Sequence, residues 1–131
     1  WLLDPDACLG GISARPDASI LSYAVLSSFS LYMHRGSMEN LFGEQVDTDI
    51  QKTVCWEDQV NSDAPATFLW HTAEDNCVPV ENTYQMGMAL QKAGIPHEIH
   101  VFPKGGHGLG LVSIGEQWRP LAERWLRDLG F

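Results

Sequence analysis

Two residues of this sequence, Asp75 and His107, are of the types that serve proton transfer in nucleophilic catalysis. A carboxylate can orient a histidine ring through one nitrogen, while the other nitrogen takes a proton from a serine hydroxyl. Asp75 lies in segment 71–79, just after an apolar run, and His107 lies in the glycine-rich segment 104–108, just after another. An acid followed by a histidine, each beyond a strand end, is the order found in one class of serine hydrolase.

Each of the two residues also has a simpler explanation. The glycines around His107 permit a tight loop that would present the ring at a strand end, but they also suit a plain turn with an exposed histidine. Asp75 could form an Asx turn or cap a helix, and Glu74 competes with it as the acid. The Val-Pro pair at 78–79 would begin the next helix and direct Asp75 back to the sheet edge. We therefore expect Asp75 and His107 to be the catalytic acid and base.

A nucleophile in the expected setting is missing from the sequence. A Gly-x-Ser-x-Gly turn between a strand and a helix strains the serine and supplies an oxyanion N–H, and no run of this form occurs in the 131 residues. Ser37 lacks this setting, and we expect it to be the N-cap of a helix at 38–42. His34 is expected either to line the substrate pocket or to make a structural hydrogen bond. The sequence resembles the second half of an enzyme, with the serine upstream.

Three short apolar runs predict the strands that would position these residues. Such nearly continuous runs are typical of parallel strands covered on both faces, and they occur at 18–26, 66–71 and 98–102.

Helical patterns fill the gaps between these runs. Apolar residues repeat at helical spacing over 80–93, where Gly94 is expected to end the helix, and again over 118–129, where Pro120 suits a first turn. Two short helices are expected at 37–43 and 47–59, with Asp47 and Thr48 as possible N-caps. The segment before the first strand, 1–17, is expected to be irregular. This alternation predicts an α/β fold with about three parallel strands, helices on both faces, and chemistry at the carboxyl ends of the strands.

The composition excludes several classes of partner. With 44% hydrophobic and 19% charged residues the chain is expected to be globular. A formal charge of −9 argues against nucleic acid or an anionic membrane as a partner. No run approaches the length of a membrane span, and the N-terminus does not resemble a signal peptide.

Metal and cofactor sites are not expected either. The five histidines and three cysteines form no HExxH motif and no zinc-ligand spacing, and no phosphate-binding loop or dinucleotide fingerprint is present. The cysteines, at positions 8, 55 and 77, are expected to be reduced or buried thiols.

Taken together, several segments resemble the C-terminal half of α/β-hydrolase esterases of the acetyl-esterase and acetylxylan-esterase-like group. They occur in order at 15–23, 34–43, 64–72, 75–82 and 100–108. The resemblance implies that 1–131 is the C-terminal portion of a single α/β-hydrolase domain. It also implies a carbohydrate acetyl esterase, with Asp75 and His107 as triad acid and base and a small-molecule or carbohydrate ester as substrate.

Two other interpretations stay open. A serine peptidase domain of the prolyl-oligopeptidase type shares this fold and a similar order of acid and histidine, and a truncated hydrolase could lack catalysis altogether. Without the upstream half, we expect no serine-esterase activity. We also expect self-association, because the first strand would expose an unpaired edge.

Overall fold

The computed structural model describes residues 15–28, 31–43 and 48–131, and it is built on a parallel sheet in the order β1-β2-β3. The strands are β1 (Ala18–Ser22), β2 (Ala66–Thr72) and β3 (His97–Phe102). The central strand, β2, is aligned with β1 from Ala18 opposite Ala66, and with β3 from Thr67 opposite His97. All three carboxyl ends therefore meet at one edge of the sheet.

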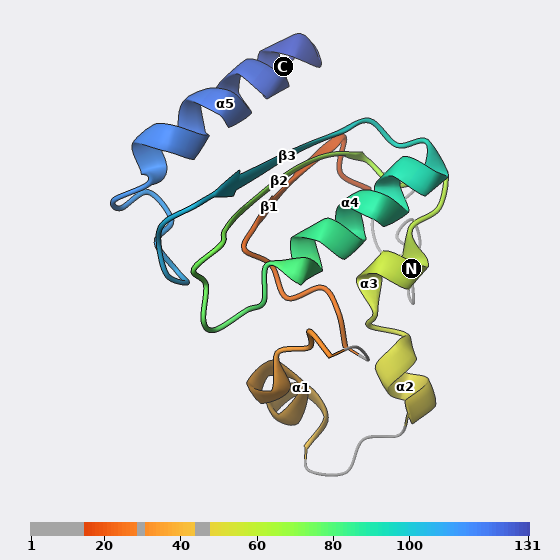
Figure 1. Ribbon diagram of the computed structural model, residues 1–131. Coiled ribbons are helices and arrows are strands. Elements are labelled where there is room, and N and C mark those ends of the chain that lie inside the picture. Colours follow the sequence, from red (N-terminus) through yellow and green to blue (C-terminus); the bar gives the residue numbers. More distant parts are fainter. Residues whose placement is uncertain (1–14, 29–30, 44–47) are drawn as a thin grey trace.

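The helices follow the strands in the alternating order that the sequence predicts (Figure 1). Three short helices come between β1 and β2, one longer helix joins β2 to β3, and another follows β3: α1 (Arg35–Phe42), α2 (Thr48–Lys52), α3 (Trp56–Gln59), α4 (Glu81–Ala93) and α5 (Gly115–Asp128). None of the helices in the described ranges is long and apolar enough to cross a membrane.

The two long helices cover opposite faces of the sheet (Figure 1). Side chains alternate along a strand, so Leu69 of β2 packs with Met86 and Leu90 of α4, whereas Phe68 and Trp70 pack in a second cluster with α5. Phe68, Leu69 and Trp70 are completely buried, and burial of Phe68 and of Leu69 each stabilises the fold by about 1.5–3 kcal/mol. The predicted α/β architecture, with three parallel strands and helices on both faces, is confirmed.

The first strand ends earlier than the predicted limit at residue 26. The chain leaves the sheet at Tyr23, which has a positive φ of 39°. The N–H groups of Leu26 and Ser27 are then bonded to the side chain of Asn82 instead of to a strand. The apolar character of this run therefore reflects burial under α4 and not a longer strand.

Two predicted helices also differ from the structure. The helix expected over 47–59 is divided into α2 and α3 by turn hydrogen bonds at residues 53–55, and Asp47 lies outside the described residues. Pro120 is not in a first turn, because α5 begins at Gly115. The buried Ile114 accepts the first hydrogen bonds of α5, from Gln117 and Trp118. By contrast Gly94 ends α4 as predicted, in the left-handed conformation with φ 72°.

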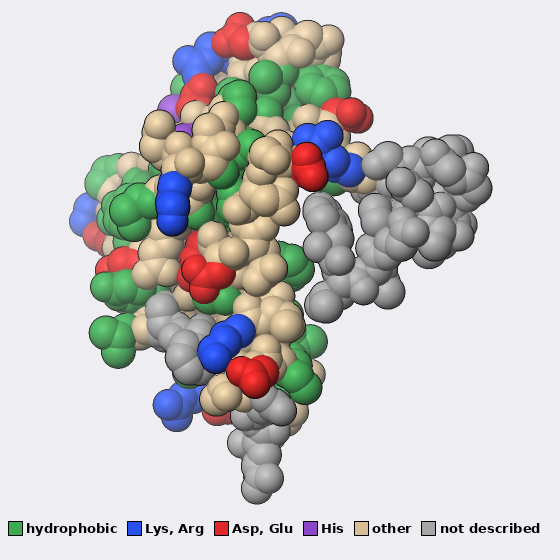
Figure 2. Space-filling view, turned by 90° about the vertical axis from the view of Figure 1, so that its right-hand side faces the viewer, with side chains coloured by type: hydrophobic (Ala, Val, Ile, Leu, Met, Phe, Trp, Pro, Cys, Tyr) green, Lys and Arg blue, Asp and Glu red, His purple; other side chains and the backbone are tan. Residues whose placement is uncertain are grey.

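Charges are mixed on the face of the molecule drawn in Figure 2, where several Lys or Arg side chains lie beside acidic ones. Ion pairs among the described residues include Arg119 with Glu116 and Arg124 with Glu98. The predicted lead-in segment, 1–17, lies almost entirely outside the described residues.

Candidate active site

Asp75 lies in the loop that leaves the carboxyl end of β2, and its side chain is completely buried. Its Oδ1 atom accepts the backbone N–H groups of Cys77 and Val78, each at 2.9 Å. These bonds form an Asx-type turn, which was the simpler explanation for this residue. They occupy one carboxylate oxygen and leave Oδ2 for other partners.

His107 binds that second oxygen. Its Nδ1 atom lies 2.8 Å from Oδ2 of Asp75, although the two residues are 32 positions apart. Glu74, the competing acid, instead pairs with Lys104 at 2.5 Å on the surface. The structure therefore brings Asp75, and not Glu74, to the histidine.

The loop that carries His107 is shaped by glycine. Gly105 has φ 128°, and a Cβ there would lie 2.8 Å from Leu109 and 3.1 Å from Thr72. The hydroxyl of Thr72 donates to the carbonyl of Gly105 at 2.8 Å, which ties the loop to the end of β2. The close approach of this loop to the end of β2 therefore depends on the absence of a side chain at residue 105.

The ring of His107 is partly exposed, with 32% of its side chain accessible. Tyr23 packs against it edge-on, with ring centroids 4.8 Å apart. Because Nδ1 faces Asp75, Nε2 is the nitrogen on the far side of the ring from the carboxylate. This arrangement can accept a proton at Nε2 while Asp75 stabilises the resulting imidazolium.

The carboxyl group of Asp75 is held in its charged form. Burial alone would raise the pKa of Asp75, but the hydrogen bonds from the Val78 N–H, His107 and the Cys77 N–H outweigh it and lower this pKa. Asp75 is therefore an anion at neutral pH, as orientation of a histidine requires.

His34 has a structural partner in this fold. It is the N-cap of α1, and its Nδ1 atom accepts the N–H of Ser37 at 3.2 Å and lies 2.8 Å from the Ser37 hydroxyl. The expectation that Ser37 is the N-cap is wrong, because the imidazole of His34 accepts the N–H that a cap side chain must satisfy. The Nε2 atom of His34 lies 3.5 Å from Sγ of Cys77, two residues beyond Asp75. Its role in substrate binding stays a prediction.

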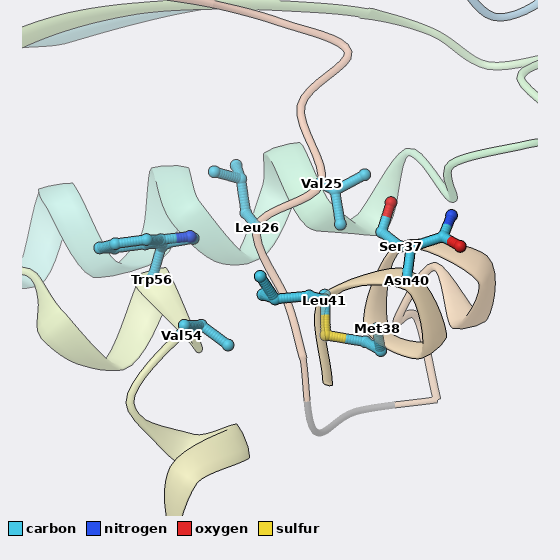
Figure 3. Close-up of a pocket in the computed structure, with 8 residues that line it drawn as sticks. All are labelled: Val25, Leu26, Ser37, Met38, Asn40, Leu41, Val54 and Trp56. Carbon is cyan, nitrogen blue, oxygen red and sulfur yellow. The ribbon is translucent and has the colours of Figure 1, made fainter. Parts of the chain in front are cut away.

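An open, mostly apolar cavity of about 450 Å³ lies beside α1 (Figure 3). Ser37 and Asn40 lie at one end and Trp56 at the other, and the remaining lining residues are Val25, Leu26, Met38, Leu41 and Val54. Neither Asp75 nor His107 lines this cavity. The cavity is therefore not the place where this pair would transfer a proton.

Two residues around the pair were not predicted from the sequence. His71, at the end of β2, lies 3.2 Å from Oδ2 of Asp75, and Tyr23 packs on His107. The sequence signal for His71 was a histidine inside a buried strand, four residues before the acid.

Within the described ranges, no three His, Cys, Asp or Glu side chains form a group that could hold a metal ion.

Comparison with known families gives one match over nearly the whole chain. A model described as the prolyl oligopeptidase family matches residues 4–129.

Two curated proteins are similar in sequence. Endo-1,4-beta-xylanase B of Butyrivibrio fibrisolvens is 42% identical over 102 residues, which are 78% of this chain and 16% of that protein. Acetylxylan esterase of Xylanibacter ruminicola is 29% identical over 120 residues, which are 88% of this chain and 24% of that protein. The chain thus spans a quarter or less of either protein.

Solved structures are similar over a larger share of their length. An acetyl ester-xyloside bifunctional hydrolase from Caldicellulosiruptor lactoaceticus has a TM-score of 0.88 and 41% identity, over 98% of this chain and 48% of that one. A thermophilic esterase from Thermogutta terrifontis, solved with butyrate bound, has a TM-score of 0.75 and 25% identity, over 98% of this chain and 49% of that one. The chain thus corresponds to about half of each structure.

Proposed function

This chain belongs to the prolyl oligopeptidase family, and we propose that it carries the acid and base of a serine esterase of the α/β-hydrolase type. The observation that carries the proposal is the contact of 2.8 Å between His107 and the buried carboxylate of Asp75. The nucleophilic serine would come from a segment N-terminal to these residues. The likeness to solved esterases over about half of their chains supports this division.

In the proposed reaction the serine oxygen attacks the ester carbonyl carbon while His107 takes the hydroxyl proton at Nε2. The tetrahedral intermediate then collapses, the bond to the alcohol oxygen breaks, and His107 returns the proton to that oxygen. Water repeats the sequence on the acyl-enzyme and releases the acid. Asp75 stays ionised throughout and stabilises the imidazolium form of His107.

The proposed substrate is a small acyl ester of a sugar or xylan-type alcohol. Two of the similar proteins, at 41% and 29% identity, are an acetyl ester-xyloside hydrolase and an acetylxylan esterase. The pair of Asp75 and His107 sets no acyl preference by itself, so the substrate class depends on this likeness.

The test is ester hydrolysis by the intact parent protein, with an activated acetate ester and acetylated xylan as substrates. We expect His107→Gln and Asp75→Asn each to lower kcat by about 10⁴-fold or more. His100→Gln is the control, because His100 pairs with Glu98 on β3 and does not contact Asp75. Variants of Asp75 and His107 that keep near-normal turnover would contradict the assignment.

A second test concerns the nucleophile. The 131-residue chain by itself is expected to show no turnover of the acetate ester and no labelling by a serine-directed phosphonate. Turnover that disappears in Ser37→Ala would show that Ser37 is a nucleophile after all, and would overturn the proposal of an upstream serine.

A second candidate function is a serine peptidase, because the matching family is named for an oligopeptidase. It would use the same acid and base on an amide instead of an ester. Cleavage of a proline-containing peptide by the parent protein, without hydrolysis of either acetate ester, would favour the peptidase. Absence of both activities would favour a hydrolase-like protein without catalysis.

A further inference from the structure

A third side chain, His71, contacts the proposed acid and has no part in the reaction described above. It lies near the end of β2, and its side chain is completely buried. Its Nδ1 atom is 2.8 Å from the hydroxyl of Thr83. Its Nε2 atom is 3.0 Å from the carbonyl oxygen of Val78 and 3.2 Å from Oδ2 of Asp75.

These partners determine which nitrogen of His71 carries the proton. A carbonyl oxygen can only accept a hydrogen bond, so the short contact with Val78 requires a proton on Nε2. Burial disfavours the charged imidazole and lowers the pKa of His71. The ring is therefore neutral, and its unprotonated Nδ1 accepts the hydroxyl proton of Thr83. The Nε2 proton is shared between Val78 and Asp75.

With this proton in place, the carboxylate of Asp75 has four N–H donors. Two backbone groups bind Oδ1 and two imidazoles bind Oδ2. A buried anion is tolerated only when such donors surround it. A rotation of the carboxyl group would weaken several of these bonds together, so the donors hold Oδ2 where His107 meets it.

We propose that His71 is a positioning residue, a neutral imidazole that donates its Nε2 proton to Asp75 and so holds the oxygen that orients His107. The catalytic consequence rests on the proposed esterase function, whereas the proton position and the contact do not. Any effect on catalysis would pass through Asp75, since the ring of His71 is buried behind it.

A purely structural role is the alternative, in which His71 only fills space and bonds Thr83. Two substitutions separate these roles, because an asparagine amide reaches the place of Nδ1 and a glutamine amide reaches the place of Nε2. His71→Asn keeps a partner for Thr83 and loses the donor to Asp75. His71→Gln keeps the donor to Asp75 and loses the partner of Thr83.

The first experiment uses the intact parent protein and needs no activity. Long-range ¹H–¹⁵N NMR spectra of the histidine rings at neutral pH identify the protonated nitrogen of each ring. We expect His71 to carry its proton on Nε2. A proton on Nδ1 would overturn the proposal, because Asp75 would then receive no donor from His71.

The second experiment measures kcat and KM of the intact parent protein on an activated acetate ester. We expect His71→Asn to lower kcat by about ten- to hundred-fold with little change in KM, and His71→Gln to recover most of the loss. His100→Asn and His100→Gln are matched controls on β3 and are expected to leave both constants unchanged. Equal losses in His71→Asn and His71→Gln, or a normal kcat in His71→Asn, would overturn the proposal.

The two experiments also separate this proposal from the function on which it rests. A parent protein without ester hydrolysis would contradict the proposed function, and the NMR result would still decide the proton position. If His71→Asn fails to fold, the comparison of His71→Gln with the wild type carries the test, because positioning predicts near-normal kcat for a folded His71→Gln. A folded His71→Gln with kcat reduced as much as in Asp75→Asn would refute it.

Discussion

At the scale of the residue, the two oxygens of Asp75 have separate tasks. Oδ1 closes the turn to Cys77 and Val78, and Oδ2 faces His107 and His71. A turn-forming aspartate and a catalytic acid are often treated as alternative explanations of one residue. Here the turn fixes the direction in which the second oxygen points, so the structural use supports the proposed chemical one.

Acid should destabilise this chain in two separate pH ranges. Burial lowers the pKa of His71 in the folded state, so below about pH 6.5 the unfolded chain binds a proton that the folded chain does not. The free energy of unfolding therefore falls as the pH drops below that value. Burial opposes ionisation of Asp75, but its hydrogen bonds lower its pKa, so stability is lost again below about pH 4.

Urea unfolding of the wild type and His71→Gln, measured from about pH 7.5 to about pH 2.5, checks this expectation. The substitution should remove much of the stability loss in the upper range and leave the lower one. His100→Gln serves as the control and should keep the loss that His71 causes. If His71→Gln loses as much unfolding free energy in the upper pH range as the wild type does, His71 is not the source of that loss.

At the scale of the elements, Asn82 joins the start of α4 to the segment that follows β1. Its Oδ1 accepts the N–H groups of Leu26 and Ser27, and its Nδ2 donates to the carbonyls of Tyr32 and Pro79, at 2.8–3.0 Å. The completely buried amide thus uses both acceptor and both donor positions. Asn82 thus connects the segment between β1 and α1 to the loop between β2 and α4, which carries Asp75.

Loss of this amide should be costly. Asn82→Ala removes four side-chain hydrogen bonds, two of which bind the buried N–H groups of Leu26 and Ser27, so we expect the free energy of unfolding to fall by about 3 kcal/mol or more. Asn40→Ala, on an exposed position of α1, is the matched control and should change it by less than about 0.5 kcal/mol. Chemical denaturation measures both. Equal effects of the two substitutions would contradict a linking role for Asn82.

The glycine loop before His107 offers a comparison between adjacent residues. Gly105→Ala would place an alanine at a positive φ, with its Cβ pressed against Thr72 and Leu109. At Gly106 an added Cβ would have no atom within 4 Å, and the backbone φ is not in the left-handed range. We expect Gly105→Ala to destabilise the chain by about 1–3 kcal/mol. Gly106→Ala should be nearly neutral. A thermal unfolding series shows the difference, and two equal effects would count against a constrained loop.

At the scale of the whole molecule, the sheet has two edges. Within the described ranges β1 pairs only with β2, and β3 also pairs only with β2. Ile20 of β1 is 39% exposed even though it lies in a strand. An apolar strand with an unpaired edge can pair with another chain.

We therefore expect the 131-residue chain to self-associate. Sedimentation velocity at increasing concentration should show species larger than the monomer, and Ile20→Lys should weaken the association by placing a charge on the edge strand. Met88→Lys, on the exposed side of α4, is the matched control and should have less effect. A monodisperse, cooperatively folding monomer at all concentrations would contradict the expectation.

Predictions from the local sequence pattern were accurate where the residues of a segment themselves determine its secondary structure and its ends. The strand at 66–71 and the helix at 80–93 each agree with the structure to within one residue at both ends, and Gly94 ends the helix as expected. They failed where a distant group takes over a local hydrogen bond. Asn82 captures the N–H groups that would have extended β1, and His34 caps α1 in place of Ser37.

The amino-acid sequence alone determined the alternation of strands and helices, and with it the edge of the sheet where Asp75 and His107 lie. Periodicity and turn residues carry this information because they act between neighbours along the chain. The sequence already favoured Asp75 over Glu74 as the acid, but only the tertiary structure brings the Asp75 carboxylate to His107 and adds His71 to the pair. The contact between Asp75 and His107 depends on how two loops 32 residues apart in the sequence pack together, with an accuracy finer than the length of a hydrogen bond.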